Sequence, residues 1–313
     1  MARLFIVTPA GAGMRNGNRH TALRWATLLR QKGHRVGIGM HWQGEPCNAL
    51  IALHARRSHA SVLALQRKKP LIVVLTGTDL YKDLPAGSNE VRESIALADR
   101  LVVLQDAALA ELAPEARRKA RVVYQSADPR VRHAPPRNRF RIAVVGHLRG
   151  EKDPFRAAAA LSRLQDGNLE VVQIGAALES SFKTEAEKRM QADARYRWLG
   201  GMPHGRALGW MARSHLLVVS SLMEGGANVI AEAARIGTPV LASRMSGNVG
   251  MLGRAYPGYF TVGDDAALAN LILACRKPAF HAQLKRHLRL RRPLFAPAAE
   301  RAALSRVLHE VLR

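Results

Sequence analysis

Short runs of apolar residues alternate along the chain with longer segments that have the spacing of amphipathic helices. The apolar runs are rich in Val, Ile and Leu, which is typical of strands buried in a parallel sheet. The strands predicted in the first half are residues 4–8, 36–40, 50–53, 71–75, 101–104 and 121–124. Those predicted in the second half are residues 142–145, 169–174, 216–220 and 240–243. Strands that alternate with helices from end to end predict an α/β fold with parallel sheets.

A polar, proline-bearing stretch, SADPRVRHAPPRNR, separates the two sets of strands at residues 126–139. A chain of 313 residues is long enough for two cores, and each half carries its own strands and helices. We therefore predict two facing Rossmann-like domains with a deep cleft between them. The predicted domains are residues 1–134 and 135–313, and the last predicted helix covers residues 298–312.

The net charge of +24 raises nucleic acid, membrane surfaces and small anions as partners. Residues 1–139 hold 23 basic and 10 acidic residues and residues 140–313 hold 25 and 14, so the excess is not confined to a tail. The densest basic run is 285–292, which fits a solvated helix face or, alternatively, a membrane-surface or nucleic-acid patch. No RNA-binding signature or helix-turn-helix pattern accompanies it, so nucleic acid is not an expected partner.

The chain has no apolar run as long as a membrane span and no signal-peptide-like stretch at its start. Cys47 and Cys275 are its two cysteines, and neither a disulfide framework nor a zinc site is indicated. No cluster of metal ligands and no Ser-His-Asp order can be read from the sequence. We expect a cytoplasmic protein without stable membrane insertion, without a metal and without a cofactor.

The segment SSLMEGGANVIAEAARIGTPVLAS, residues 220–243, contains the strongest candidate site. Glu224 and Glu232 flank a turn that opens a helix, and the turn consists of Gly225, Gly226, Ala227 and Asn228. Backbone N–H groups at a helix start bind an anion, and carboxylates on either side can accept hydrogen bonds from sugar hydroxyls. An ordinary βαβ unit with surface glutamates is the alternative. The segment resembles the donor site of family 4 retaining glycosyltransferases, which have the GT-B fold. That resemblance assigns Glu224 to the transferred sugar, the turn to the diphosphate and Glu232 to the ribose.

The second predicted domain begins with a strand and a glycine turn, FRIAVVGHLRGEKDP, that carries His147, Arg149 and Lys152. Preorganised cations stabilise the charge that develops on a departing diphosphate. In family 4 enzymes an arginine usually follows the glycine directly and a lysine follows a glutamate. Lys152 matches that lysine, whereas His147 stands in the arginine position. Which side chain replaces the arginine is open, with Arg149 favoured, and a surface loop with incidental charges is the alternative.

The loop after the first strand, TPAGAGMRNGNRH, contains Gly13 and leads into a helix that Asn18 can cap. It forms either a second anion-binding helix start or a plain turn, because a lone G-x-G pattern is weak. With Arg19, Asn18 is a candidate for binding an anionic acceptor at the first helix, and Gly13 is a candidate for the donor.

Two further loops follow strands of the first half, and ligands of such folds collect at strand carboxyl ends. The loop ALHARRSHA places Arg56 and Arg57 side by side, where their fork-shaped donors could clamp an oxyanion. The loop LTGTDLYKDL carries Thr78 and Asp79. Asp79 is either a structural cap or a group that orients an acceptor.

Several segments together are similar to the selenosugar synthases of bacterial selenoneine biosynthesis, over residues 1 to about 245. The discriminating pieces are ALHARRS, TGTDLYKDL and GHLRGEKDP. The resemblance implies a transferase that joins selenophosphate to the anomeric carbon of a UDP-N-acetylhexosamine such as UDP-N-acetylglucosamine, releases UDP and phosphate, and is coupled functionally to other selenoneine pathway enzymes. In the wider family the terminal helix often crosses back to the first domain. The alternatives are a family 4 enzyme with a lipid or polysaccharide acceptor and a non-catalytic nucleotide-sugar or nucleic-acid binding protein.

Overall fold

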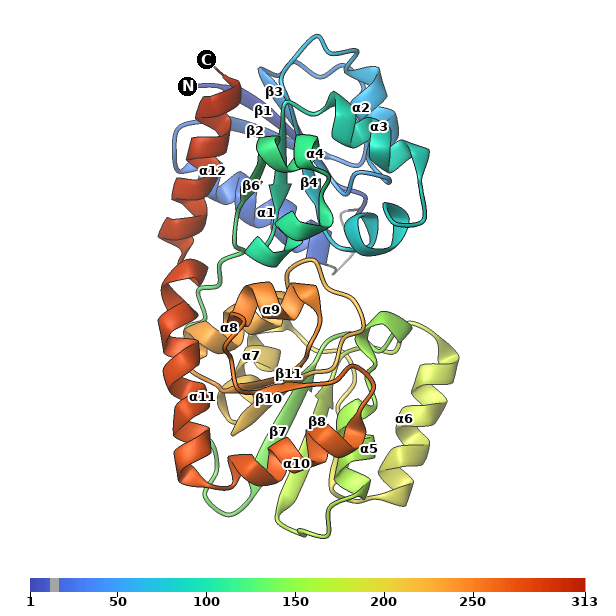
Figure 1. Cartoon of the computed structure of the whole chain (residues 1–313), viewed down its shortest axis with the longest axis vertical. Helices are drawn as coiled ribbons and strands as arrows, with labels where there is room; N and C mark the ends of the chain where they lie inside the picture. The colour runs from blue at the N-terminus through green and yellow to red at the C-terminus, as the bar shows by residue number, and fades with distance from the viewer. Residues whose placement is uncertain (12–16, 313) are drawn as a thin grey trace. The chain divides into compact units, whose positions relative to one another are not determined.

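A computed structural model describes residues 1–11 and 17–312, which form two compact units (Figure 1). The first unit contains Met1–Ser126, Glu224–Gly226 and Ala296–Arg313, and the second contains Ala127–Met223 and Ala227–Phe295. The boundary predicted at residues 134 and 135 therefore lies inside the opening segment of the second unit, and the last helix belongs to the first unit.

The first unit is built on a parallel sheet in the order β2-β1-β3-β4-β5-β6. Its strands are β1 (Arg3–Val7), β2 (Arg35–Gly39), β3 (Ala49–Leu53), β4 (Leu71–Leu75), β5 (Arg100–Val103) and β6 (Ala120–Val122). Every residue of β3 and β4 is buried, because helices cover both faces of the sheet. This explains why these strands read as continuous apolar runs rather than alternating ones. The six strands predicted from the sequence are confirmed, with ends shifted by at most two residues.

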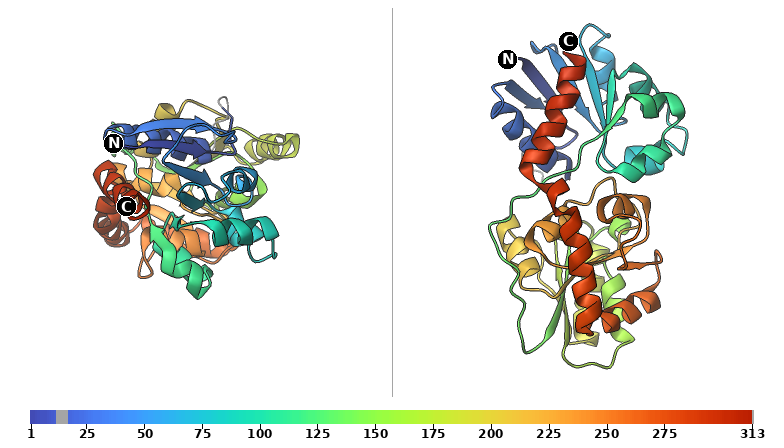
Figure 2. Two further views of the ribbon diagram at one scale, coloured as in Figure 1. Left: turned by 90° about the horizontal axis from the view of Figure 1, so that it is seen from above. Right: turned by 60° about the vertical axis from the view of Figure 1, so that its left-hand side comes forward.

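Five α-helices surround the first sheet within the described chain: α1 (Gly17–Arg30), α2 (His59–Ala64), α3 (Asn89–Leu97), α4 (Pro114–Lys119) and α12 (Pro297–Val311). The last of these, α12, lies beside α1 and buries an apolar stripe in the same core as Trp25 (Figure 2). The buried carboxylate of Glu300, near the start of α12, accepts hydrogen bonds from Trp25 Nε1 at 2.7 Å and from Arg24 Nε at 2.9 Å. Because a buried charge is costly unless it is paired, these bonds attach α12 to the first unit specifically.

The second unit has its own parallel sheet in the order β12-β11-β10-β7-β8-β9. Its strands are β7 (Phe140–Val145), β8 (Leu169–Ile174), β9 (Tyr196–Trp198), β10 (Leu216–Val219), β11 (Val240–Ser243) and β12 (Tyr259–Phe260). The four strands predicted here are confirmed, whereas the two edge strands β9 and β12 were missed. Edge strands this short have too few residues to show a hydrophobic period.

The described α-helices of the second unit are α5 (Arg156–Ser162), α6 (Ser180–Ala192), α7 (His204–Ala212), α8 (Asn228–Ile236), α9 (Ser246–Leu252), α10 (Asp265–Cys275) and α11 (Pro278–Arg291). Helix α8 has a strongly amphipathic sequence, with buried Ile230 and Ile236 on the inner face. It ends at Gly237, whose φ of 95° is a left-handed conformation that glycine adopts without a steric penalty. No helix in the described part of the chain is long and apolar enough to cross a membrane.

Both sheets reverse their strand order at one place. In the first unit the chain moves from β1 to β2 on one side and then returns to β3 on the other side of β1. In the second unit it moves from β7 through β8 to β9 and returns to β10 on the other side of β7. Ligands of doubly wound sheets bind outside the strand carboxyl ends at such a reversal. The loops after β1 and β3, and those after β7 and β10, are therefore the places to look for a site.

Candidate functional site

The loop after β7 is held in place by the loop after β8. A Cβ atom on Gly175 would lie 1.9 Å from the carbonyl oxygen of Gly146, so only glycine allows the two backbones to approach this closely. Ala176 N donates to Nδ1 of His147 at 3.3 Å, and Leu148 N donates to the carbonyl oxygen of Ala176 at 2.9 Å. The turn that carries the predicted cations is therefore fixed at the carboxyl edge of the sheet.

The predicted cations Arg149 and Lys152 lie on this turn, which includes the short 3-10 helix η3 (Gly150–Lys152). The turn is tied to the segment that follows β10, because Ser220 Oγ donates to the carbonyl oxygen of Asp153 at 2.8 Å. Leu222 N also donates to the carbonyl oxygen of Glu151 at 2.9 Å. The loops after β7 and β10 thus meet at the point where the strand order reverses.

The structure distinguishes the two candidates for the missing family arginine. Nδ1 of His147 accepts a hydrogen bond from the backbone N–H of Ala176 at 3.3 Å, and the side chain is partly buried. Arg149 keeps its charge at every working pH and is 46 % exposed at its side chain. Its nearest carboxylate, that of Glu151, lies 3.9 Å away, which is too long for a strong hydrogen bond. Arg149 is therefore the more exposed of the two candidates, and its role as the second cation beside Lys152 stays a prediction.

Helix α8 begins at Asn228, with Ala227 at its N-cap position. The N-cap residue is an alanine, whose side chain offers no acceptor, and the first N–H groups of any helix lack an acceptor within the helix. Such an end suits an anion, as the sequence predicted. Glu232 lies one turn inside α8, because the helix starts at Asn228 rather than at the glycines. Glu224, which is largely buried, and the two glycines Gly225 and Gly226 belong to the first unit.

The carboxylate of Glu232 has a partner that was missed from the sequence. Nε2 of His204, the first residue of α7, lies 2.8 Å from Glu232 Oε1. This hydrogen bond raises the pKa of His204, and burial opposes it. Within the described chain no group bonds the second carboxylate oxygen of Glu232, which can therefore accept hydroxyl groups of a ligand while His204 holds the first. No sequence motif could have identified His204, since the pair is separated by a whole βα unit of chain.

In the first unit, Asp79 organises the two loops that follow β3 and β4. Its buried carboxylate accepts hydrogen bonds from the backbone N–H groups of Ala55, Thr76, Gly77 and Leu80 at 2.8 to 3.1 Å. A carboxylate with this many backbone donors has little capacity left for a substrate. The structure thus supports the structural alternative for Asp79 over a direct role in acceptor binding.

His54 connects the same two loops through its side chain. It is buried and has a φ of 72°, a left-handed conformation that costs a non-glycine residue about 1 to 3 kcal/mol and persists where the surroundings enforce it. Its Nδ1 accepts a hydrogen bond from Arg57 N at 3.3 Å, so Nε2 carries the proton that is donated to Thr78 Oγ1 at 2.8 Å. Burial lowers the pKa of His54. Thr78, which is partly exposed, can then donate its own hydroxyl proton to a ligand.

The two adjacent arginines after β3 are not equivalent. Arg56 Nη1 forms an ion pair with Asp83 Oδ1 at 3.0 Å. Arg57 is exposed, and no carboxylate of the described residues forms an ion pair with it. The pair therefore does not form a symmetric clamp, and Arg57 is the more available anion-binding group.

The predicted residues near β1 are only partly described. Gly13 lies outside the described residues. Asn18 is the second residue of α1, so it lies within the helix and does not occupy the cap position that the sequence predicted. Arg19 follows it in the first turn, with intermediate exposure for both side chains.

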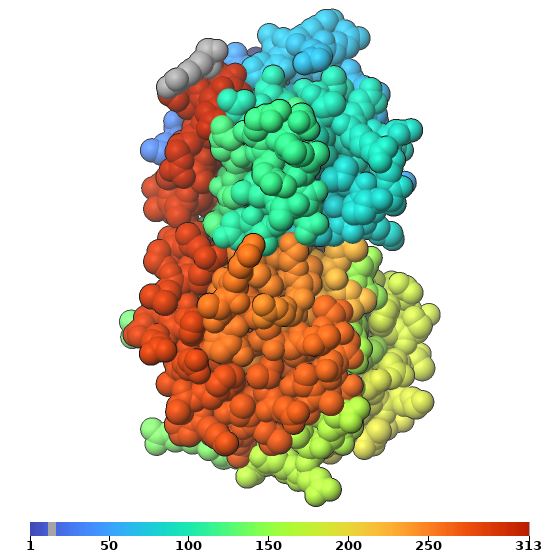
Figure 3. All heavy atoms as spheres, in the orientation of Figure 1, coloured from blue at the N-terminus to red at the C-terminus, as the bar shows by residue number. Residues whose placement is uncertain are grey.

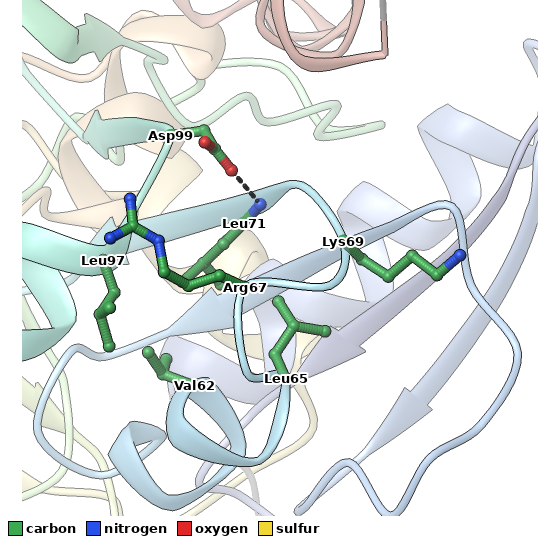
Figure 4. A pocket seen from close by; sticks show the side chains of 7 residues that line it. All are labelled: Val62, Leu65, Arg67, Lys69, Leu71, Leu97 and Asp99. Atoms are coloured by element: carbon green, nitrogen blue, oxygen red, sulfur yellow. Dashed lines mark hydrogen bonds between the residues drawn. The ribbon is translucent and has the colours of Figure 1, made fainter.

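A small cavity of about 50 Å³ opens elsewhere in the first unit (Figure 4). It is lined by Val62, Leu65, Arg67, Lys69, Leu71, Leu97 and Asp99. Asp99 Oδ2 accepts a hydrogen bond from Leu71 N at 2.7 Å, at the first residue of β4. The cavity therefore lies at the amino ends of the strands, opposite to the edge at which ligands of this fold bind. It is too small for a nucleotide and is not a candidate active site.

Comparison with known proteins identifies the family of the chain. Residues 126–286, slightly more than half of the chain, match the family model described as "Glycosyl transferases group 1". The match contains the loop after β7, the η3 turn and the whole of α8.

Solved structures with similar folds cover nearly the whole chain. Anabaena Alr3699/HepE in complex with UDP is 18 % identical, with a TM-score of 0.79 over 99 % of this chain and 100 % of that chain. Sucrose-phosphate synthase from Thermosynechococcus elongatus is 15 % identical, with a TM-score of 0.81 over 98 % of both chains. A glycosyltransferase from Rickettsia africae is 12 % identical, with a TM-score of 0.76 over 99 % and 98 %. These matches confirm the predicted fold, an α/β protein with two Rossmann-like units of the GT-B type.

Proposed function

Because the chain belongs to the group 1 glycosyl transferases, we propose that it transfers an N-acetylhexosamine from UDP to selenophosphate. The coarse activity, glycosyl transfer from a nucleotide sugar, follows from the family. The uridine nucleotide is supported by HepE, whose structures contain UDP and UDP-glucose. The selenium acceptor is supported by the segments that resemble selenosugar synthases, ALHARRS, TGTDLYKDL and GHLRGEKDP.

In the proposed reaction the selenium atom of selenophosphate forms a bond to the anomeric carbon of the sugar. The bond from that carbon to the diphosphate oxygen breaks, and its electron pair leaves on UDP. Water then cleaves the selenium–phosphorus bond, which releases phosphate and the selenosugar. A selenium nucleophile is already strong, so the first step does not need a general base.

One observation carries the donor part of the proposal. The η3 turn presents Lys152 and Arg149 at the carboxyl edge of the second sheet, and hydrogen bonds from Ser220 and Leu222 fix that turn to the loop after β10. Positioned cations stabilise the negative charge on departing UDP more than they stabilise the bound substrate. Glu232, oriented by His204, would hold the ribose.

The acceptor part rests on the loops after β3 and β4 in the first unit. Arg57 is exposed, and His54 directs the hydroxyl group of Thr78. A guanidinium fork and a hydroxyl donor suit a small tetrahedral oxyanion such as selenophosphate. In this proposal Asp79 holds the two loops together and does not touch the acceptor.

Incubation of the purified protein with UDP-N-acetylglucosamine and freshly prepared selenophosphate tests the proposal. Mass spectrometry should detect UDP together with a selenium-containing sugar, and omission of selenophosphate should suppress UDP release. A protein that hydrolyses UDP-N-acetylglucosamine at the same rate with and without selenophosphate, and forms no selenosugar, would contradict the selenium acceptor.

The second candidate is transfer to a lipid or polysaccharide acceptor. The long stretch from residue 266 to 299, which contains no acidic residue, favours it because such an enzyme works at an anionic membrane. The two candidates share the donor site and differ in the acceptor. Polyprenyl phosphate in detergent micelles, offered in place of selenophosphate in the same assay, distinguishes them.

A further inference from the structure

Helix α11 and the turn η4 (Arg292–Phe295) present a basic groove on the second unit, away from the loops after β7 and β10. The groove has a volume of about 390 Å³ and is lined by Ala234, Gly237, Ala282, Lys285, Arg286, Leu288, Arg289 and Arg292. We refer to its four cations, Lys285, Arg286, Arg289 and Arg292, as the α11 face. Figure 3 shows this part of the chain, in red-orange, on the outer surface of the second unit.

The cations of the α11 face have no acidic neighbours along the chain. No Asp or Glu occurs between Asp265 and Glu300. None of the four cations forms an ion pair in the part of the chain that the structure describes. Other arginines of the region differ, since Arg276 is paired with Asp166 at 3.3 Å and Arg291 donates to the carbonyl oxygen of Gly250 at 2.6 Å. Arg276 and Arg291 are thus bonded to protein groups, whereas the cations of the α11 face are exposed to solvent.

An exposed apolar side chain lies directly beside these cations. Leu290 is 73 % exposed, the largest exposure of any Leu, Ile, Val or Phe among the described residues. Arg286 is four residues before Leu290 on α11, so the two side chains are neighbours on one helix surface. Besides the four cations, the residues that line the groove are small or apolar: Ala234, Gly237, Ala282 and Leu288.

We propose that the α11 face is a docking surface for anionic phospholipid bilayers. Arginine and lysine groups bind the headgroup phosphates, and Leu290 inserts at the boundary between headgroups and acyl chains, which is the combination that interfacial helices use. The protein lies on the surface and does not span the bilayer. This inference does not require the proposed selenium acceptor, although the acid-free stretch that carries it also favours the lipid acceptor.

Nucleic acid fits this face less well. Proteins that bind single strands add aromatic rings on which bases stack, and no Phe, Tyr or Trp lines the groove. An exposed leucine beside the cations adds nothing to phosphate binding, whereas it stabilises a membrane contact.

Vesicle co-sedimentation of the full chain tests the proposal. The parent protein should sediment with phosphatidylglycerol–phosphatidylcholine vesicles at 0.1 M NaCl, remain in solution with pure phosphatidylcholine, and be released at about 1 M NaCl, where the Debye length falls to about 3 Å. The double variant Arg286→Glu with Arg289→Glu should lose at least about tenfold in vesicle affinity. Leu290→Ser should weaken binding without any change in charge.

Matched control variants distinguish an effect of the α11 face on vesicle binding from an effect of the protein's net charge. Lys32→Glu with Lys68→Glu makes the same change in net charge at exposed positions of the first unit, and Leu178→Ser removes another exposed leucine. Both controls should sediment like the parent, and all variants should keep the melting temperature and UDP affinity of the parent.

Three results would overturn the proposal. The first is equal loss of vesicle binding in the Lys32 and Lys68 control, which would mean that net charge alone is responsible. The second is equal sedimentation with neutral vesicles. The third is duplex or single-stranded DNA that displaces the protein from vesicles at equal phosphate concentration and binds through the same arginines, which would make the face a nucleic-acid surface.

Discussion

The loops after β3 and β4 in the first unit and the loop after β7 in the second unit both lie at strand carboxyl ends, but they use charge in opposite ways. In the first unit the buried carboxylate of Asp79 is surrounded by backbone N–H groups. In the second unit, Arg149 is exposed on a turn that backbone and serine hydrogen bonds hold in place. The comparison indicates that a buried acid gives the first pair of loops their shape, whereas backbone and serine hydrogen bonds fix the second loop and leave the side chain of Arg149 exposed.

The largest expected effect follows from removing the buried acid. Asp79→Ala leaves the N–H groups of Ala55, Thr76, Gly77 and Leu80 without their acceptor, and each unpaired buried donor costs about 1 to 3 kcal/mol. We expect the free energy of unfolding of the first unit to fall by about 4 kcal/mol or more, measured by urea denaturation. An Asp79→Ala variant with the stability of the parent would show that the carboxylate does not organise these loops.

The next effect concerns activity rather than stability. Lys152→Ala should lower kcat for UDP release by about 100- to 1,000-fold, or about 2.7 to 4 kcal/mol, because it removes a positioned cation from the leaving group. Its melting temperature should match that of the parent, in contrast to Asp79→Ala. The control is Lys183→Ala, an exposed lysine of α6, which should leave kcat unchanged. Normal turnover by Lys152→Ala would remove this lysine from the donor site.

The contrast between the two regions also shows which features could be predicted from the sequence. Buried strands have a strong apolar signal, so ten of the twelve strands were predicted within two residues. The turns that follow the strands were predicted as sites because the topology of a parallel sheet places all strand carboxyl ends, and the charged residues beside them, at one edge of the sheet. Lys152 was chosen as a candidate in this way, and its role at the site stays a prediction.

What could not be predicted are the contacts between side chains that lie far apart in the sequence. Two such contacts are His204 with Glu232 and Arg56 with Asp83. They depend on how helices and loops pack back onto the sheet, which no local sequence pattern predicts. For the same reason the sequence left the role of Asp79 open, because a carboxylate that bonds four backbone groups and one that faces a ligand have the same local sequence.

A third prediction concerns the opposite, amino-terminal edge of the second sheet, where histidines are held neutral. His133 Nε2 donates to the carbonyl oxygen of Ser214 at 2.9 Å, and Nδ1 of His215 accepts from Arg141 N at 3.1 Å. Burial lowers the pKa of both His133 and His215 to about 4. The unfolded chain therefore binds more protons, so stability is present above the unfolded pKa of about 6.5 and is lost as the pH falls towards 4.

With solvent screening taken into account, the two histidines together should lower the free energy of unfolding by about 2 kcal/mol between pH 7 and pH 5. Urea denaturation over this range measures the loss. In His133→Gln the free energy of unfolding should change less steeply with pH, because one of the two titrating groups is gone while an amide donor to Ser214 remains. If the free energy of unfolding of this variant depends on pH as steeply as that of the parent, then burial in the fold does not keep His133 neutral.

A fourth prediction tests the inequality of the two adjacent arginines. Arg57→Lys keeps the charge but removes the guanidinium fork, so the KM for selenophosphate should rise about tenfold while UDP affinity stays the same. Arg56→Lys can retain an ion pair with Asp83 and should change this KM by less than about threefold. Competition kinetics with inorganic phosphate provide a second measurement, since phosphate should compete with selenophosphate. A larger effect for Arg56→Lys, or loss of UDP binding in Arg57→Lys, would contradict the assignment.

The smallest expected effect concerns His204, whose side chain is 58 % exposed where it meets Glu232. The hydrogen bond to Glu232 raises the pKa of His204, so its contribution to stability is complete below the unfolded value of about 6.5 and is lost as the pH rises through the folded value. For an exposed pair this amounts to about 0.5 kcal/mol. His204→Gln retains an N–H donor for Glu232 but cannot titrate at this position, so the melting temperature should rise slightly more between pH 6 and 8 in this variant than in the parent, where the loss of the His204 contribution offsets part of the gain from His133 and His215. UDP affinity of His204→Gln should stay near that of the parent, and His204→Ala should bind UDP a few-fold more weakly because Glu232 is no longer oriented. If both variants bind UDP like the parent, then His204 does not position Glu232, and the pairing contributes only to the surface of α7.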